Sequence, residues 1–190
     1  MGVRRRLGRY LKFKRRYLRG VLSERKHSTI RLGLVRPEYQ RVYIECGGKV
    51  YGEAIIGRVR YLRLSELSEE DALRDGFTSL EDLFTNLESI YPSLKPSDWV
   101  TVIEFEVVEK FNPPLDKRDL TSSGEYVRIA RLGLAYNAYR SSEERRILAA
   151  IVAGGGLLNA VKELDNMTMN KAIRVLNSVR GRLRRMGLIA

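Results

Sequence analysis

Cysteine and histidine are nearly absent from this 190-residue chain, which contains one of each, Cys46 and His27. A single cysteine excludes an internal disulfide framework and any metal cluster built from cysteines. A single histidine argues against an ordinary zinc site, so we expect no metal and no cofactor. Glutamine is also scarce, because Gln40 is the only one, while 31% of the residues are charged. Few thermolabile amides beside many ion-pairing residues indicate a thermophilic source.

Long apolar runs are missing as well. The longest nearly uncharged apolar stretch, residues 147–158, is too short and too rich in glycine to span a bilayer. We therefore expect a cytoplasmic protein with no membrane partner. The arginine-rich, acid-poor start is also typical of a transit peptide. Residues 10–14 nevertheless alternate like a strand and lead directly into the motifs described below, which favours a place in the fold.

The net charge of +12 is distributed unevenly along the chain. Residues 1–36 contain 13 basic residues and one acid, whereas residues 65–125 contain five basic residues and 15 acids. Residues 126–190 are basic again, with 12 basic residues and four acids. A solvated surface does not require such segregation, but a surface that binds phosphates does, because each neutralised phosphate releases condensed counterions. The distribution therefore favours nucleic acid as the partner.

The first part of the sequence predicts mixed α and β structure. Strands are expected at residues 10–14, 29–32, 42–46, 50–62 and 99–111, and helices at 15–23, 68–75 and 79–91. Gly47 and Gly48 predict a hairpin turn, and Gly52 and Gly57 predict bulges in the long strand. Many short strands with glycine bends indicate a small barrel with helices on one side.

Residues 112–125 contain two prolines and a Ser-Ser-Gly run, which indicate a linker. Four helices are expected after it, at about 125–139, 142–153, 156–165 and 168–186. The last of these helices has the clearest periodicity. Its apolar stripe consists of Ala172, Leu176, Val179, Leu183 and Met186, and the opposite face carries Lys171, Arg174, Ser178, Arg182 and Arg185.

Residues 24–31 read Glu-Arg-Lys-His-Ser-Thr-Ile-Arg and match a G-x-K-x-x-T-x-R pattern at Lys26, Thr29 and Arg31. Further matching segments follow in order: residues 52–54 (Gly-Glu-Ala), 64–67, 75–77 (Asp-Gly-Phe), 79–83, Tyr91 and 102–105. On these motifs, residues 10–111 resemble the ASCH domain of the PUA-like superfamily, and the whole chain resembles an archaeal-type protein of this kind. Glu24 stands where that pattern has glycine.

The resemblance implies a PUA-like barrel whose cleft, beside its first helix, cradles RNA. It also implies an alternative, because some ASCH proteins are amidohydrolases that deacetylate N4-acetylcytidine. By position, the catalytic residues would be Lys26, Thr29 and Asp75, with a desolvated lysine activating the threonine hydroxyl. Asp75 is one methylene shorter than the glutamate of that pattern.

Residues 141–190 resemble a winged helix-turn-helix, which implies a third reading as a DNA-binding transcriptional regulator with the last helix in the major groove. The predicted fold class is α+β: a small PUA-like (ASCH) β-barrel with flanking helices, plus an all-α, winged-helix-like C-terminal module. The expected domains are a basic tail over residues 1–9, the barrel over 10–111, the linker over 112–125 and the helical domain over 126–190.

RNA binding is the function that the sequence favours, with ribosomal RNA ahead of transfer RNA, ribosomal proteins as further partners and DNA behind them. Tyr10, Phe13 and Tyr17 are interleaved with the N-terminal basic residues and are candidates for base stacking. The candidate nucleic-acid-binding residues are Arg4, Arg5, Arg6, Arg9, Lys12, Lys14, Arg15, Arg16, Arg19, Lys26, Arg31, Lys171, Arg174, Arg182 and Arg185.

Overall fold

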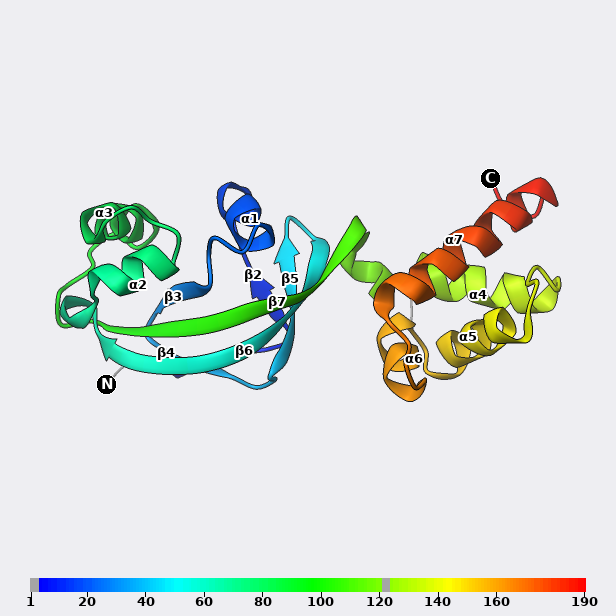
Figure 1. The fold of residues 1–190 in the computed structure, drawn as a ribbon, viewed down its shortest axis with the longest axis horizontal. Coiled ribbons are helices and arrows are strands. Elements are labelled where there is room, and N and C mark those ends of the chain that lie inside the picture. Colours follow the sequence, from blue (N-terminus) through cyan, green and yellow to red (C-terminus); the bar gives the residue numbers. More distant parts are fainter. Residues whose placement is uncertain (1–3, 121–123) are drawn as a thin grey trace. The chain divides into compact units, whose positions relative to one another are not determined.

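The computed structural model describes residues 4–120 and 124–190, with Arg4 and Asp119 described by their backbone alone. The chain divides into two compact units, Met1–Lys110 and Phe111–Ala190 (Figure 1). Strands and helices both occur, so the predicted α+β class is confirmed.

In the described residues, the strands of the first unit form a five-stranded and a two-stranded sheet, with orders β2-β5-β6-β7-β3 and β1-β4. The strands are β1 (Arg4–Leu7), β2 (Tyr10–Lys12), β3 (Ser28–Leu32), β4 (Leu34–Pro37), β5 (Arg41–Cys46), β6 (Lys49–Arg63) and β7 (Trp99–Asp116). β2 pairs with β5 in parallel, whereas β5 with β6 and β3 with β7 are antiparallel. We predicted a small barrel, but no ladder joins β2 to β3 within the described ranges, so the larger sheet has two open edges there and a closed barrel is not shown.

The hairpin between β5 and β6 forms where the two adjacent glycines predicted it. Gly47 and Gly48 have φ values of 59° and 78°, which suit a two-residue hairpin turn. Farther along, the register between the strands shifts by one residue beside Gly52, so a bulge is confirmed there. A Cβ atom at Gly52 would lie 2.2 Å from the carbonyl oxygen of Glu109, so only glycine lets these backbones approach.

The expected basic tail needs correction over residues 4–7, which form β1 and pair in parallel with β4. Arg5 Nη2 donates to the carbonyl oxygen of Leu32 at 2.5 Å, and Arg6 forms an ion pair with Glu38 at 3.2 Å. Backbone hydrogen bonds to β4 hold residues 4–7 as a strand, although their sequence has no strand pattern. The sequence of β4 has no such pattern either, so this strand was not predicted. Residues 1–3 of the expected tail lie outside the described residues.

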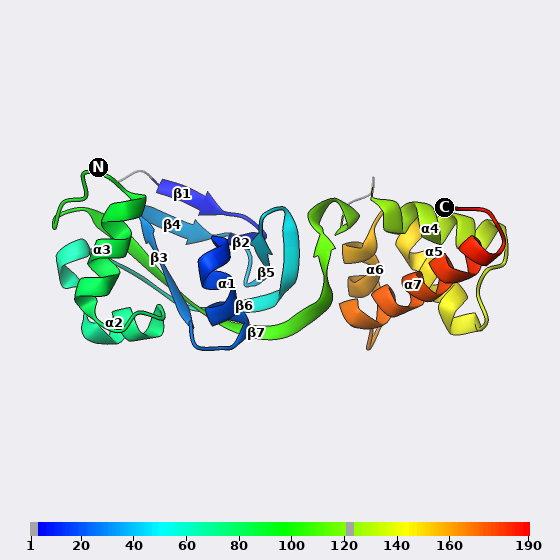
Figure 2. The ribbon, with the colours of Figure 1, turned by 90° about the horizontal axis from the view of Figure 1, so that it is seen from above.

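Three helices of the first unit, α1 (Arg15–Leu22), α2 (Glu69–Arg74) and α3 (Leu80–Ile90), lie on one side of β6 and β7 (Figures 1 and 2). Ser68 and Ser79 cap α2 and α3, with their side chains accepting from the backbone N–H three residues later. Apolar side chains of α1, β2, β5 and β6 share one core, and those of α2 and α3 share a second with β3 and the start of β7. Packing α1 and the α2–α3 pair separately onto the sheet positions the cleft described below.

After the end of β7, the described part of the second unit is helical: η2 (Lys117–Leu120), α4 (Glu125–Ala135), α5 (Ser142–Ala153), α6 (Leu157–Glu163) and α7 (Met169–Arg185). The four predicted helices are therefore present. Regular structure through Leu120 replaces most of the expected linker, and residues 121–123 of it lie outside the described ranges. No helix that the structure describes has the length and apolar character needed to cross a membrane.

The predicted apolar stripe of α7 is buried from Ala172 to Leu183, as the helical period requires. Met186, expected to continue the stripe, is 51% exposed because α7 ends one residue before it.

Candidate functional site

A cleft of about 220 Å³ opens in the first unit where α1, β3 and the α2–α3 pair meet. The β2–α1 connection forms one edge, and the segments before β3 and after α2 form its base. The residues that line it are Lys12, Phe13, Lys14, Tyr17, Lys26, Thr29, Ile30, Arg31, Asp75, Phe77, Asn86, Leu87 and Ile90. All four residues that the ASCH resemblance singles out, Lys26, Thr29, Arg31 and Asp75, are among them.

Lys26 and Asp75 form a buried ion pair in the cleft. Lys26 precedes β3, and Asp75 is the C-terminal cap of α2. The Lys26 Nζ donates to the Asp75 carbonyl oxygen at 2.6 Å and also to its carboxylate Oδ1. The two residues are 5% and 6% exposed. Gly76, with φ of 86°, then turns the chain closely past the Lys26 side chain.

Burial acts against the charge on both partners of this pair. Desolvation lowers the pKa of Lys26, and the Asp75 charge and hydrogen bond only partly oppose it. Desolvation likewise raises the pKa of Asp75 from 3.8 to about 6, against the opposing influence of Lys26 and Arg31. Burial thus disfavours the charged form of both members, and ionisable groups with pKa values shifted in this way are frequent at functional sites.

Aromatic rings enclose the lysine. Its Nζ lies 5.4 Å from the ring centroid of Tyr17 and 5.8 Å from that of Phe77, within cation–π range of both. The two rings meet edge to face at 6.4 Å, and the Tyr17 hydroxyl donates to Asn86 Oδ1 at 2.7 Å. This bond joins α1 to α3 across the cleft. The walls are therefore flat, apolar and fixed.

Thr29 and Arg31 extend from β3 into the same cleft. The Arg31 Nη2 donates to the Lys12 carbonyl oxygen at 2.6 Å and lies 5.8 Å from the Phe13 ring centroid. Thr29 is 4% exposed, and its hydroxyl forms no hydrogen bond within the described part of the chain. The structure thus brings the three predicted catalytic residues to one cleft but does not join Thr29 to Lys26.

Exposed cations lie on β2 and α1 and on the connection between them, and two of them, Lys12 and Lys14, line the cleft. Lys12 lies 4.0 Å from Glu45, and Arg16 lies over the Tyr17 ring at 4.8 Å. The side chains of Lys14, Arg15 and Arg19 are exposed and have neither a hydrogen bond nor an ion pair among the described residues. Because α1 has no acid in its first turn, the positive potential at this edge is not cancelled locally. Of the predicted basic residues 12–19, Lys12 and Lys14 line the cleft, whereas Arg15 and Arg19 line a separate hollow on α1 with Leu18, Leu22 and Ser23. The exposed cations of residues 12–19 are together called the basic rim.

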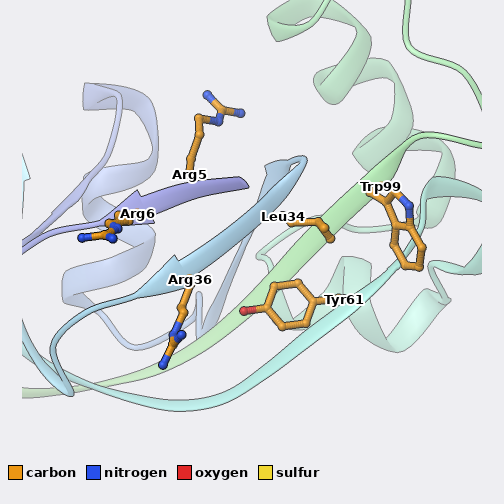
Figure 3. A pocket seen from close by; sticks show the side chains of 6 residues that line it. All are labelled: Arg5, Arg6, Leu34, Arg36, Tyr61 and Trp99. Carbon is orange, nitrogen blue, oxygen red and sulfur yellow. The ribbon is translucent and has the colours of Figure 1, made fainter. Parts of the chain in front are cut away.

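The other N-terminal candidates lie elsewhere. Arg9 stacks over the Tyr39 ring at 4.2 Å, and the Arg4 side chain is outside the described residues. Arg5 and Arg6 line a separate surface hollow of about 660 Å³ (Figure 3). Its other lining residues are Leu34, Arg36, Tyr61 and Trp99. The sequence analysis did not single out Arg36, Tyr61 or Trp99, because a linear pattern does not show which residues of separate strands line the same space.

The candidates of α7 divide into two groups. Arg182 has a side chain only 11% exposed and donates to the Ala138 carbonyl oxygen at 2.5 Å and to Glu144 at 2.6 Å. These bonds hold Arg182 within the helical unit, and its role in nucleic-acid binding stays a prediction. Lys171 pairs with Glu143 at 2.5 Å. Arg174 and Arg185 are exposed, and neither side chain bonds to another described residue.

Acidic residues, cysteine and histidine do not gather in groups of three that could hold a metal ion anywhere in the described ranges. The candidate chemistry of the cleft therefore comes from Lys26, Asp75 and Thr29 themselves, from the aromatic walls and from the basic rim.

No family profile matches this sequence, and no curated protein matches it. Among solved structures, the ASCH domain from Lactobacillus crispatus JV V101 covers 48% of this chain and 69% of its own, with 16% identity and a TM-score of 0.44. A protein from Enterococcus faecalis V583 covers 50% and 72%, with 19% identity and a TM-score of 0.41. A serine-to-alanine variant of the ASCH protein from Zymomonas mobilis covers 60% and 76%, with 14% identity and a TM-score of 0.47. Similarity of this degree does not indicate what this chain binds or catalyses.

Proposed function

We propose that the protein binds RNA through the cleft and its basic rim, as the ASCH-like motif residues of the cleft suggest. The observation that carries this proposal is the exposed, unpaired Lys14 in the lining of a cleft with aromatic walls, followed on the adjoining helix α1 by the unpaired Arg15 and Arg19. Folded RNA is recognised largely through its phosphates and shape, and unpaired bases through stacking on aromatic rings. The rim supplies the first kind of contact, and Tyr17 and Phe77 supply flat surfaces for the second.

A structured RNA is the partner that we propose, with ribosomal RNA as the first candidate. The support is the density of positive charge: 13 basic residues against one acid in residues 1–36, in an order that offers no base-reading code. Crosslinking in cells, followed by sequencing of the bound RNA, identifies the partner directly. Recovery of DNA alone would contradict the proposal.

The rim is tested by measuring RNA affinity as a function of salt concentration. Replacing Lys14, Arg15 and Arg19 by alanine removes three phosphate contacts, so the slope of log affinity against log salt should become less negative by roughly 2–3. A control variant with alanine at Lys49, Arg58 and Lys95, which are exposed residues of the same unit, removes the same charge elsewhere. Equal weakening by the two variants would show that only net charge matters and would reject the rim.

A second function, amide hydrolysis on an acylated nucleoside, is favoured by one observation: Thr29 lies in the cleft beside a lysine whose pKa burial lowers. In this reaction the Thr29 oxygen attacks the acyl carbon, the C–N bond breaks, and the amine leaves with a proton that Lys26 has taken from the hydroxyl. Water then hydrolyses the acyl ester. The Lys26 bonds to Asp75 must rearrange first, because Thr29 is not bonded to Lys26.

The two functions are separated by incubating the protein with N4-acetylcytidine and following release of cytidine and acetate by chromatography. Activity that disappears in Lys26→Ala would support the hydrolase. Absence of product with the intact protein would reject hydrolysis of the free nucleoside and leave RNA binding as the function.

A further inference from the structure

The hollow lined by Arg5, Arg6, Leu34, Arg36, Tyr61 and Trp99 shares no residue with the cleft. Its lining comes from four different strands: β1, β4, β6 and β7. In Figure 3 the three arginines extend from the β1 and β4 side, and the two rings from the β6 and β7 side. At about 660 Å³ it is also the larger of these two spaces.

Positive charge at the hollow exceeds what neighbouring acids neutralise. Arg6 pairs with Glu38, but the Arg5 guanidinium donates to a neutral carbonyl oxygen, and Arg36 is exposed without an ionic partner in the part of the chain that the structure describes. Arg63 adds a further cation, since its guanidinium lies 4.0 Å from the Trp99 ring centroid. The hollow is therefore built to meet anions.

Two aromatic rings lie beside these cations. Tyr61 is 46% exposed, although large aromatic side chains are usually covered in a folded domain. Its hydroxyl is 3.4 Å from the Val35 carbonyl oxygen, which holds the ring beside β4 without burying it. Trp99 is half-buried at the start of β7. An exposed ring that faces a group of cations is the combination by which proteins hold single-stranded nucleic acids, with bases stacked on the ring and phosphates on the cations.

We infer that this hollow binds an unpaired stretch of RNA, with a base stacked on the exposed Tyr61 ring beside Trp99 and the adjoining phosphates on Arg5 and Arg36. Double-stranded RNA fits less well, because its bases are already stacked and their faces are covered. The choice of RNA as the ligand rests on the proposed function, but the site is independent of the cleft. One chain would then hold two parts of the same RNA at separate places.

The only tryptophan of the chain, Trp99, lies in the hollow and reports on it directly. Titration of the full chain with a short oligouridylate should change Trp99 fluorescence in a saturable way, whereas the matching RNA duplex and inorganic polyphosphate should not. A deoxyuridylate of equal length shares the base and phosphate chemistry, and we expect it to bind more weakly. Equal binding of the two strands would overturn the assignment to RNA, and an equal response to polyphosphate would overturn the stacking.

Two variants test the lining. Tyr61→Ala should weaken oligouridylate binding by about fivefold or more, since stacking on one ring contributes that much, and Tyr61→Phe should retain binding. Arg36→Ala should make the salt dependence less steep by about 0.7, the value for one phosphate of a single strand. Arg58→Ala removes an exposed arginine of the same strand as Tyr61 and should change neither quantity.

The outcome distinguishes this site from the cleft. If the rim variant loses RNA affinity while Tyr61→Ala and Arg36→Ala bind as tightly as the natural protein, the hollow is rejected and the proposed function stands. If the hollow variants alone lose affinity, the hollow is supported and the rim is rejected. Failure of the natural protein to bind any RNA would reject both.

Discussion

Replacing Lys26 by methionine removes the positive partner of Asp75 and leaves its carboxyl group in the same buried position. Methionine fills a similar volume and can pack between the Tyr17 and Phe77 rings, so the change isolates the charge. The Asp75 carboxyl would lose both the charge and the hydrogen bond that now lower its pKa, and that pKa should rise above its present value of about 6.

The magnitude follows from the pKa of Asp75 in the folded and unfolded states. A rise from 3.8 to about 6 means that the folded state binds the proton more tightly, so the stability of the first unit falls as pH increases through this range, by about 3 kcal/mol. In Lys26→Met the decline should continue to higher pH. At pH 8 the loss relative to the natural protein should be about 3–5 kcal/mol, as for other buried pairs that lose one partner. At pH 5, where Asp75 is protonated, the loss should be about 1 kcal/mol or less.

Denaturant unfolding followed by the fluorescence of Trp99 measures this, because the only tryptophan lies in the first unit. The unfolding free energies of the natural protein and of Lys26→Met are compared at pH 5 and pH 8. The double variant Lys26→Met/Asp75→Leu is the control. It removes the buried charge and should recover most of the stability at pH 8, because apolar replacements of buried pairs are often neutral.

A loss of stability that is equal at pH 5 and pH 8 would refute the reasoning, because it would trace the effect to packing and not to the carboxylate. The same conclusion would follow if the double variant were no more stable at pH 8 than Lys26→Met alone.

Gly52→Ala should lower the unfolding free energy of the first unit by about 3 kcal/mol or more, because the new Cβ would lie 2.2 Å from the Glu109 carbonyl oxygen. Denaturant unfolding followed by tryptophan fluorescence measures this loss. A loss below about 1 kcal/mol would show that the two strands can move apart easily. Arg182→Ala should destabilise the second unit by about 2–3 kcal/mol, followed by helical circular dichroism, because it removes charged hydrogen bonds to Glu144 and a carbonyl oxygen. The RNA affinity of Arg182→Ala should equal that of the natural protein, when both are measured at a temperature at which the second unit of the variant is folded. A lower affinity under these conditions would show that Arg182 contributes to RNA binding.

Local sequence patterns predicted the helices and the longer strands because each carries its own signal. Serine caps and helical periodicity located α2, α3 and α7, and β-branched runs located β5 and β6. The β1–β4 pair has no such signal. A run of three arginines is a poor strand former, and only its backbone bonds to β4, far along the chain, make it a strand. Whether the larger sheet closes also depends on pairing between strands that are distant in the sequence. Local sequence patterns therefore did not predict its two open edges.

The cleft could be predicted only through the resemblance, since charge patterns do not show which basic residues share a surface. Lys26 and Asp75 are 49 residues apart, and nothing in their local spacing joins them. Glu24 illustrates what the structure adds. It stands where the family pattern has glycine and has a φ of 57°, a left-handed conformation that glycine adopts without strain. Its ion pair with Lys110 holds the turn that leads into Lys26.

The number of basic residues in the sequence overstates how many cations a polyanion can contact, because several arginines form ion pairs with acids of the same unit. Arg60 is paired with the buried Asp71, Arg41 with the buried Glu53, and Arg182 with Glu144. These arginines neutralise acids within the fold. A phosphate that bound one of them would leave its carboxylate unpaired, which costs several kcal/mol of free energy when the carboxylate is buried. A ligand must therefore use cations that the fold leaves unpaired. Among the described residues of the first unit, Lys14 in the cleft and Arg36 in the hollow are such cations, and each lines a space that also contains aromatic rings, which is why both are assigned to RNA.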